Sequence, residues 1–230
     1  RSYYTAFLLF SCNAIFLNHC SENCLICYYY SMQQIILASS SPRRKEILTG
    51  LGLDFMIVPS NSDEQLDENQ PAYEVAKQLA LAKAQSVAME YSSSYIIGAD
   101  TIVALHGRQM AKPRTIEEAR EMLTSLAGKE STVSTGIAIV NSQLQVELID
   151  VATTHVYFKP NSKTIQNLRE DYLATNDWQD KAGGYGIQSG AAPLIGRIVG
   201  EYDTVVGLPT NLLTTLLRSA GINIPYSTKA

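Results

Sequence analysis

Two arginines stand where a helix start is already positive. In the stretch LASSSPRRKEIL, residues 37–48, Ser41 and Pro42 are followed by Arg43 and Arg44. If Ser41 is the N-cap, both arginines fall in the first helical turn, where carboxylates are normally favoured. Backbone N–H groups, hydroxyls and two guanidinium groups would together form a cradle for a phosphate. The alternative is an ordinary turn with two solvent-exposed arginines, and this stretch alone does not decide between them.

Other charged residues lie on apolar segments or in polar loops. Asp100 falls within IIGADTIVA, where we expect a carboxylate to be paired, metal-bound or catalytic, or else to cap a strand end. Lys83 continues the spacing of a long apolar helical face, so its ammonium either reaches an anionic site or extends outward to solvent. Lys112 and the loop residue Glu64 fit a surface position equally well. Together these charges are the complement of a metal-bound polyphosphate.

Glycine is concentrated near the end of the chain. The segment 181–209 holds seven of the 14 glycines. This density predicts positive φ values or the close approach of other groups to the backbone. Within it, KAGGYGIQSG carries Lys181 and Gln188, although the same stretch is also compatible with a simple sharp turn.

The apolar pattern predicts alternating helices and strands. Strands are expected at 35–38, 55–59, 95–105, 132–140 and 144–158, and helices at 43–52, 72–91, 115–128, 162–174 and 210–221. The segment 95–105 fits either one long strand or a strand pair. Thr115 and Glu118 have the spacing of a capping box. Because only some strands are linked through helices, we expect a single α/β domain with a mixed sheet.

Composition narrows the function classes. The chain has 230 residues, of which 46% are hydrophobic and 17% charged, as in one globular domain. A net charge of -4 argues against a nucleic-acid binder, which needs a basic surface. All four cysteines lie in the first 31 residues. The remaining chain has no disulfide framework, as expected in the reducing cytoplasm, and a zinc site at Cys20, Cys24 and Cys27 is disfavoured because a convincing partner pair is missing.

Residues 1–31 differ from the rest of the chain. They are apolar and aromatic, but polar residues break every run before the length of about 18 that a membrane helix needs. Met32 directly precedes the first well-patterned strand. We therefore expect the functional chain to start at Met32, with residues 1–31 as an extension outside the fold, and we expect no membrane partner.

Several motifs occur together in one order. LASSSPRR, LALAKA, IIGADTIV, KP, and DKAGGYGIQ followed by VVGLP resemble the successive motifs of the Maf (septum formation inhibitor) nucleoside triphosphate pyrophosphatases. The resemblance covers residues 34–222. It implies an inosine-triphosphatase-like α/β fold, in which a long mixed sheet with flanking helices forms two lobes around an active-site cleft. It also implies a homodimer.

The resemblance assigns roles to individual positions. Paired arginines after Ser-Pro and the KAGGYGIQ motif are similar to the dTTP/UTP subgroup of that family. The implied roles are proton acceptor for Asp100, base specificity for Arg43, Thr101 and Gln188, and active-site charge for Glu64, Lys83 and Lys112. One departure is Ser131, which stands where relatives commonly carry a histidine.

The expected reaction converts a nucleoside triphosphate and water into the monophosphate and pyrophosphate, with Mg²⁺ or Mn²⁺. Asp100 would activate the water near the metal, which Glu64 would help to hold. Arg44, Lys83 and Lys112, together with the serines from Ser39 to Ser41, would hold the leaving pyrophosphate. Gln188 offers a donor and an acceptor that match a uracil or thymine edge.

Two alternatives stay open at this point. The same chemistry could act on another base, such as that of CTP or a modified purine nucleotide. A protein of a different class, a nucleotide-binding regulator of cell division, would also bind such a ligand. A regulator has no need of a positioned base such as Asp100, so the sequence favours the enzyme.

Overall fold

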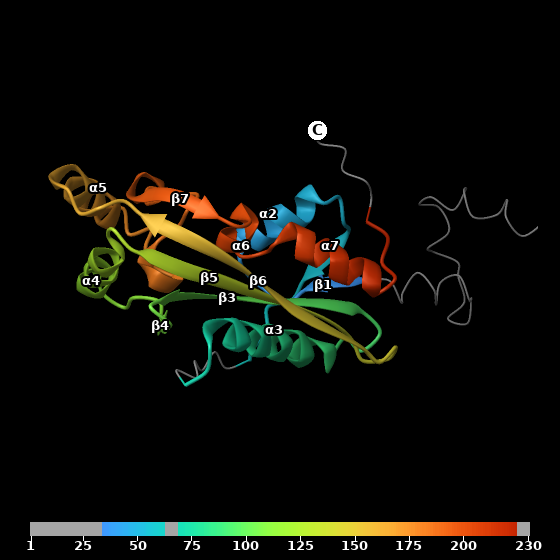
Figure 1. Cartoon of the computed structure of the whole chain (residues 1–230). Coiled ribbons are helices and arrows are strands. Elements are labelled where there is room, and N and C mark those ends of the chain that lie inside the picture. Colours follow the sequence, from blue (N-terminus) through green and yellow to red (C-terminus); the bar gives the residue numbers. More distant parts are fainter. Residues whose placement is uncertain (1–33, 63–68, 225–230) are drawn as a thin grey trace, which may run out of the picture.

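The computed structural model describes residues 34–62 and 69–224 (Figure 1). The expectations for residues 1–31 and for Glu64 lie outside the described residues. Within the described residues, no helix is long and apolar enough to span a membrane.

A mixed sheet forms the centre of the molecule. Within the described residues it has seven strands in the order β2-β1-β3-β5-β6-β7, with β4 paired to β3. The strands are β1 (Ile35–Leu37), β2 (Phe55–Ile57), β3 (Tyr95–Leu105), β4 (Arg108–Met110), β5 (Glu130–Asn141), β6 (Val146–Phe158) and β7 (Ile195–Val199). β1 runs parallel to β2 and β3, and the other pairs are antiparallel. The segment 95–105 is therefore one long strand.

Strand β3 has an interrupted edge. One side of it pairs with β5 from Ile96 to Leu105. The other side pairs with β1 at residues 95–97 and with β4 at residues 103–105. Among the described residues, 98–102 therefore have no strand partner on that side. Asp100 lies at the middle of this gap, which is where the parallel and antiparallel parts of the sheet diverge.

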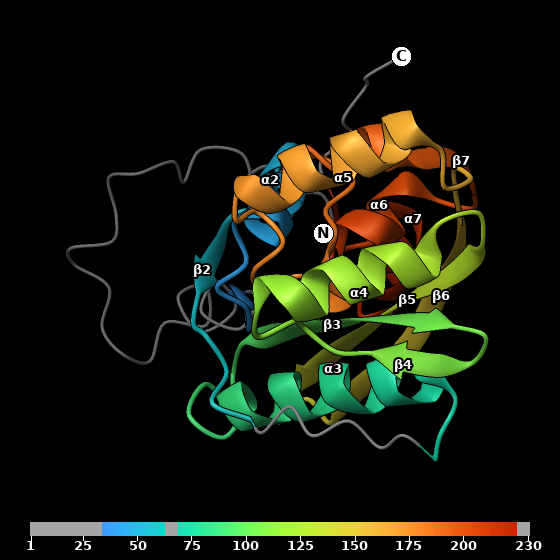
Figure 2. The ribbon, with the colours of Figure 1, turned by 90° about the vertical axis from the view of Figure 1, so that its left-hand side faces the viewer.

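Helices cover both faces and one end of the sheet. They are α2 (Pro42–Gly50), α3 (Ala72–Ala88), α4 (Ile116–Leu126), α5 (Lys163–Ala174), α6 (Tyr202–Val206) and α7 (Thr210–Ser219), with short 3₁₀ turns η1 (Ala182–Gly184) and η2 (Ala192–Leu194). Helix α3 packs on one face, while α2, α6 and α7 lie on the other (Figure 1). Helices α4 and α5 lie together at one end of the sheet, the end that faces the viewer in Figure 2.

Helix α3 lies unusually close to the sheet. A Cβ atom on Gly98 or Gly136 would collide with the carbonyl oxygens of Ala80 and Ala76, which face them from the helix. Alanines and glycines thus let the backbone of α3 settle directly onto β3 and β5. This close contact explains why Lys83, one turn further along the same helical face, is buried.

The apolar core has four clusters among the described residues, two toward opposite ends of the molecule and two between α3 and the sheet. One cluster surrounds Val103 and Leu123 and includes residues of α4 and α5. A second cluster surrounds Leu37 and Leu213 and includes residues of α2 and α7. The expected α/β fold, with a long mixed sheet, flanking helices and two lobes, is confirmed.

Local signals match the structure in most places. Thr115 caps α4 by accepting a hydrogen bond from the Glu118 N–H at 3.2 Å, as the capping-box spacing predicts. Four of the seven late glycines have positive φ, and the others adjoin close side-chain or backbone atoms; the first group is Gly183, Gly184, Gly200 and Gly207, the second Gly186, Gly190 and Gly196. β4, β7 and α6 were not predicted, because three to five residues show no readable periodicity.

Candidate active site

A cavity of about 890 Å³ opens between the two ends of the molecule. Its wall contains residues from the β1–α2 turn, the middle of β3 and the segment 176–189. It gathers Ser39, Ser41, Arg43, Arg44, Asp100, Thr101, Lys112 and Gln188. Residues far apart in the sequence, selected for their chemistry, thus meet around one space.

The β1–α2 turn is built as an anion cradle. Ser41 is the N-cap in extended conformation and Pro42 is the first helical residue. The Oγ of Ser39 accepts hydrogen bonds from the Ser41 N–H at 3.3 Å and from Arg44 Nη1 at 3.1 Å. With both lone pairs engaged, the Ser39 hydroxyl can act toward a ligand only as a donor. That is the polarity an anion requires.

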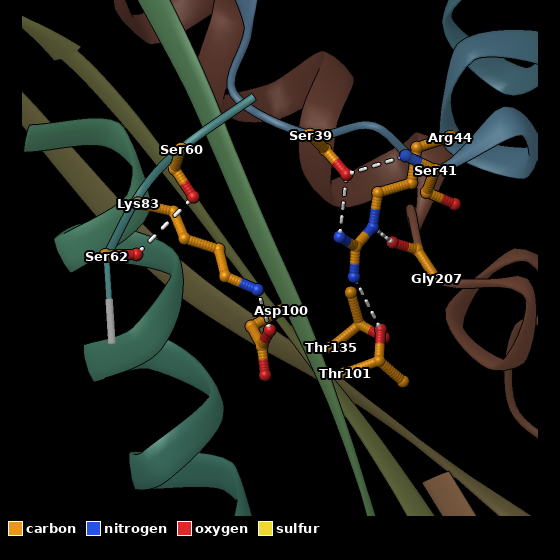
Figure 3. A network of polar contacts seen from close by, with 10 residues as sticks. All are labelled: Ser39, Ser41, Arg44, Ser60, Ser62, Lys83, Asp100, Thr101, Thr135 and Gly207. Carbon is orange, nitrogen blue, oxygen red and sulfur yellow. Dashed lines mark hydrogen bonds and ion pairs between the residues drawn. The ribbon is translucent and has the colours of Figure 1, made fainter. Parts of the chain in front are cut away.

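Arg44 is held by groups from three parts of the chain (Figure 3). Besides Ser39, its Nε donates to the Gly207 carbonyl at 2.8 Å and its Nη2 donates to Thr101 Oγ1 at 3.3 Å. Gly207 has φ +115°, which only glycine adopts without strain. The guanidinium is therefore fixed at the cavity wall before any ligand arrives.

A chain of hydroxyls continues inward from Arg44. Thr135 Oγ1, which is fully buried, donates to the Thr204 carbonyl at 2.7 Å. Because a hydroxyl has one proton, the 2.9 Å contact between Thr135 and Thr101 must be donated by Thr101. The order is Arg44 to Thr101 to Thr135 to Thr204. Thr101 consequently presents only acceptor capacity to a ligand.

Lys83 and Asp100 form a buried ion pair. The ammonium of Lys83 contacts Oδ1 of Asp100, and the two residues are only 6% and 8% exposed. Lys83 therefore does not extend to solvent, and Asp100 is not a strand-end cap. Both of those alternatives are ruled out by the ion pair in the middle of β3.

The Lys83–Asp100 ion pair and the Arg44 guanidinium lie on opposite sides of β3 (Figure 3). Alternation along a strand turns Asp100 toward α3 and Thr101 toward α6. The missing strand partner at residues 98–102 lets both sides face the same cavity. A bound ligand could therefore touch the carboxylate and the Arg44 cradle at once.

The segment 176–189 closes the cavity from the far side. Gln188 is exposed within it. The Gly183 N–H donates to the Ala111 carbonyl at 3.1 Å, which places this segment beside Lys112. Asp177 and Lys181 also line the cavity.

Part of the cavity wall is apolar. Its members are Val103, Val133, Tyr185, Ile187, Val205 and Val206. Tyr185 packs edge-on against Phe158 with ring centroids 5.0 Å apart, and burial raises the pKa of its hydroxyl to about 12. Such a wall suits the flat face of a nucleobase, next to the polar groups that could read its edge.

Comparison with known proteins identifies the family of this chain. The family model described as Maf-like protein matches residues 34–220, which include every described residue of the cavity wall. The chain belongs to the Maf-like protein family.

The matches with Maf-like relatives cover nearly the full lengths of those relatives. A dTTP/UTP pyrophosphatase of Geobacillus sp. is 44% identical over 194 residues, which are 83% of this chain and 100% of the relative. The protein of the same name from Pyrococcus furiosus is 43% identical and covers 81% and 95%. The one from Alkaliphilus oremlandii is 42% identical and covers 82% and 96%.

Solved structures give a weaker likeness. A nucleoside-triphosphatase / dITP/XTP pyrophosphatase from Mycobacterium abscessus covers 82% of this chain and 97% of its own, with a TM-score of 0.41 and 12% identity. The family assignment rests on the sequence match and not on this likeness.

The carboxylates of the Maf-like site fit a metal that arrives with its ligand. Among the described residues, no three His, Cys, Asp or Glu side chains gather to hold an ion. Asp100 nevertheless puts one carboxylate at the cavity wall beside the anion cradle. Mg²⁺ is commonly bound by one or two carboxylates together with substrate phosphates. The donor set of this cavity is of that kind.

Three features of the Maf-like site escaped sequence reasoning. Thr135 carried no motif signal, and Gly207 stands in the VVGLP motif but was given no role, since both act through contacts with residues distant in the chain. Lys181 was visible in the KAGGYGIQ motif but its partner Asp177 was not. Ser131, at the family's usual histidine position, is 1% exposed and donates to the Val156 carbonyl at 3.4 Å. Its hydroxyl therefore has a place in the core.

Proposed function

We propose that this chain is a nucleoside triphosphate pyrophosphatase that hydrolyses dTTP and UTP to the monophosphate and pyrophosphate, and so removes unwanted nucleotides from the cellular pool. The observation that carries the proposal is the single cavity in which an anion cradle, a carboxylate and an amide side chain meet. The names of relatives more than 40% identical over at least 95% of their lengths support the same reaction and the same bases.

Asp100 is the base in this mechanism. A water oxygen attacks the α-phosphorus, the bond from that phosphorus to the α,β-bridging oxygen breaks, and pyrophosphate leaves. The proton of the water passes to the Asp100 carboxylate. Lys83 holds Oδ1 of that carboxylate, so Oδ2 is the oxygen that receives the proton.

The cradle stabilises the leaving group. The charge that develops on the departing pyrophosphate lies near Arg44 and Lys112, and Lys83 contributes its charge from behind Asp100. The Ser39 hydroxyl and the N–H groups at the start of α2 donate hydrogen bonds to phosphate oxygens. Because Arg44 is already fixed by Gly207 and Thr101, little reorganisation is needed during the reaction.

Base selection falls to the far side of the cavity. The amide of Gln188 can donate to a carbonyl of uracil or thymine and accept from the imide N–H. Thr101, with only acceptor capacity, adds to the same preference, and Arg43 lies on the facing wall. A cytosine or purine edge has a different donor and acceptor order, so it leaves polar groups unpaired.

The reaction uses a divalent metal in this proposal. Asp100, and by the family pattern Glu64, would hold Mg²⁺ or Mn²⁺. A bound ion of this kind neutralises phosphate charge and acts as a Lewis acid.

A metal-dependent substrate panel tests the proposal. Purified full-length protein is incubated with dTTP, UTP, CTP, ATP, GTP and a 7-methylated GTP, with Mg²⁺, Mn²⁺ or EDTA, and pyrophosphate is measured. We expect release from dTTP and UTP with metal and none with EDTA. Faster release from CTP or a purine nucleotide would support the alternative base. Tight binding without release from any nucleotide would instead support the regulator of septum formation.

Further parts of the proposal have different grounds: the homodimer and the domain boundary follow the family pattern, the cytoplasm follows the placement of the cysteines, and the absence of nucleic-acid binding follows the net charge of -4. We propose that the protein acts as a homodimer in the cytoplasm, with residues 1–31 outside the catalytic domain, and that it binds no nucleic acid. Light scattering measures the mass in solution, and a monomer at micromolar concentration would contradict the dimer. Activity unchanged by deletion of residues 1–31 is expected, and its loss would contradict the assigned boundary.

A further inference from the structure

Lys181 links two segments: the turn that carries Gln188, and Asp177 in the segment that follows α5. Its Nζ donates to the backbone carbonyl of Asp177 and contacts the Asp177 carboxylate Oδ1 at 2.8 Å. The Lys181 side chain is only 10% exposed although it borders the cavity. Its ammonium is thus engaged by the protein and is not directed at a ligand.

The stem of Lys181 lies directly on the backbone of the same turn. A Cβ atom on Gly186 would be 2.6 Å from Cε of Lys181 and 2.8 Å from Oγ of Ser189. The hydroxyl of Ser189 donates to the Gly186 carbonyl at 2.8 Å and closes the turn. Gln188 stands within this closed turn, so its position depends on the lysine packed against Gly186.

The contact between Lys181 and Asp177, called the tie below, is anchored in the core at its Asp177 end. Asn176 and Asp180 both have φ near +60°, at 59° and 61°, which fixes the tight path of the chain between them. Trp178 is 4% exposed, and its Nε1 donates to the Leu173 carbonyl at 3.1 Å. Asp177 is therefore held between two constrained residues and cannot follow Lys181 if the pair is disturbed.

Charge interactions link Asp177 to Arg43 as well as to Lys181. Burial acts to raise the pKa of Asp177, but the hydrogen bond with Lys181 and the charges of Lys181 and Arg43 lower it below its ordinary value. Burial, together with the charge of Asp177, raises the pKa of Tyr172 to about 12. The charge of Arg43 also acts on Tyr172, and Arg43 and Gln188 both line the cavity.

We propose that Lys181 and Asp177 are positioning residues for base selection, which hold the Gln188 turn at the distance from Arg43 where the two can read one base. This inference rests on the proposed function, since it concerns how the same site distinguishes nucleotides. It assigns no contact between Lys181 and the substrate. Its consequence is a change in selectivity that is separate from any change in phosphate binding.

Binding of two non-hydrolysable nucleotides tests the inference without catalysis. The probes are α,β-imido-dUTP and α,β-imido-dCTP with Mg²⁺, and the readout is calorimetry or the fluorescence of Trp178, the single tryptophan of the chain. In wild type we expect tighter binding of the dUTP analogue. In Lys181→Met the ratio of the two affinities should fall about tenfold, the equivalent of one hydrogen bond, mainly through the dUTP analogue. Lys163→Met, an exposed lysine at the start of α5, is the matched control.

Each outcome decides the inference. Equal weakening of both analogues, which leaves the ratio unchanged, would mean that Lys181 supports phosphate binding. Unchanged affinities for both analogues would mean that the contact of Lys181 with Asp177 does not position Gln188. Either result overturns the inference. Equal affinities in wild type would overturn it as well. Asp177→Asn keeps the backbone acceptor for Lys181 and should give a smaller loss of the ratio, with an unchanged circular dichroism spectrum. Absence of pyrophosphate release with the affinity ratios behaving as expected would remove the proposed function alone.

Discussion

The two walls of the cavity are built in opposite ways. Asp100 lies in the long run of β3 that pairs with β5 from Ile96 to Leu105, and its partner Lys83 comes from the close-packed helix α3. Gln188 lies in a succession of turns whose shape depends on left-handed residues and a few side-chain bonds. The wall around Asp100, the strand wall, belongs to the core of the sheet. The wall around Gln188, the turn wall, is held to the core at a few points.

The two walls therefore suit different tasks: the strand wall suits the reaction, and the turn wall suits the choice of base. The position of Asp100 cannot shift without disturbing strand register and helix packing, so the reacting carboxylate is fixed by the fold itself. Turns tolerate substitution better than buried strands, so a base-reading side chain on a turn can be exchanged at little cost in stability. We therefore expect changes in the strand wall to alter the rate and the stability, and changes in the turn wall to alter selectivity.

Asp100→Asn should have the largest effect. The amide has nearly the same shape but cannot accept the proton of the attacking water, so we expect kcat for dTTP to fall about 10³-fold. Steady-state assays of pyrophosphate release with Mg²⁺ measure the loss. Asp150→Asn, at an exposed aspartate of β6, should leave kcat unchanged. Near-normal turnover by Asp100→Asn would show that Asp100 is not the proton acceptor.

Lys83→Met tests whether the strand wall carries stability. The substitution keeps an apolar stem but leaves the 8% exposed Asp100 without its cation, which costs about 3 kcal/mol in similar buried pairs. Urea unfolding should show this loss, and kcat should also fall. Lys77→Met on the exposed side of α3, where Lys77 pairs with Glu74 at 3.6 Å, is the control and should change stability by less than about 1 kcal/mol. An equally stable Lys83→Met protein would contradict the comparison.

Sequence reasoning reached the strand wall better than the turn wall. The capping position of Ser41, the long strand around Asp100 and the helical face of Lys83 are local patterns that a single segment displays. In the structure Ser41 and Asp100 line one cavity, and Lys83 pairs with Asp100. The resemblance to a family added the order of the motifs, which no single pattern contains.

What sequence could not supply are contacts between distant segments. Arg44 bonds to a carbonyl 163 residues away, and Gly207 is needed there because of its left-handed φ. Lys181 packs on Gly186 only because the chain turns twice between them. Short elements such as β4 and α6 form because neighbouring strands and helices are already in place, and their own residues show no period.

Gln188→Ala should change selectivity more than rate. Without the amide, the donor and acceptor that match uracil are lost, so the ratio of kcat/KM for UTP to that for CTP should fall about tenfold. The substrate panel measures this ratio. Gln143→Ala, in the exposed turn between β5 and β6, should leave it unchanged. A uniform loss for all nucleotides would show that Gln188 does not read the base.

Thr135→Val breaks the hydroxyl chain at one buried link. Valine has the same shape, but the Thr204 carbonyl and the Thr101 hydroxyl each lose a partner, which should cost about 1–2 kcal/mol. Thermal unfolding measures the loss, with Thr164→Val at an exposed position of α5 as the control. Because Thr101 then regains a proton to donate, discrimination against CTP should also weaken. A stability equal to wild type would mean that the hydroxyl chain does not support this wall.

Asp177→Asn should have the smallest effect and a distinct pH dependence. Because the folded-state pKa of Asp177 lies below 3.8, its ordinary value, its pairing with Lys181 stabilises the fold fully above that value. The contribution is lost as the pH falls through the folded-state pKa. Wild type should therefore melt slightly higher than the variant at pH 6, by a few degrees at most since the carboxylate is 40% exposed, and the difference should shrink as the pH is lowered below 3.8. A difference that stays constant as the pH falls would assign the effect of Asp177 to packing and not to charge, and the contact between Lys181 and Asp177 would then act through its apolar atoms.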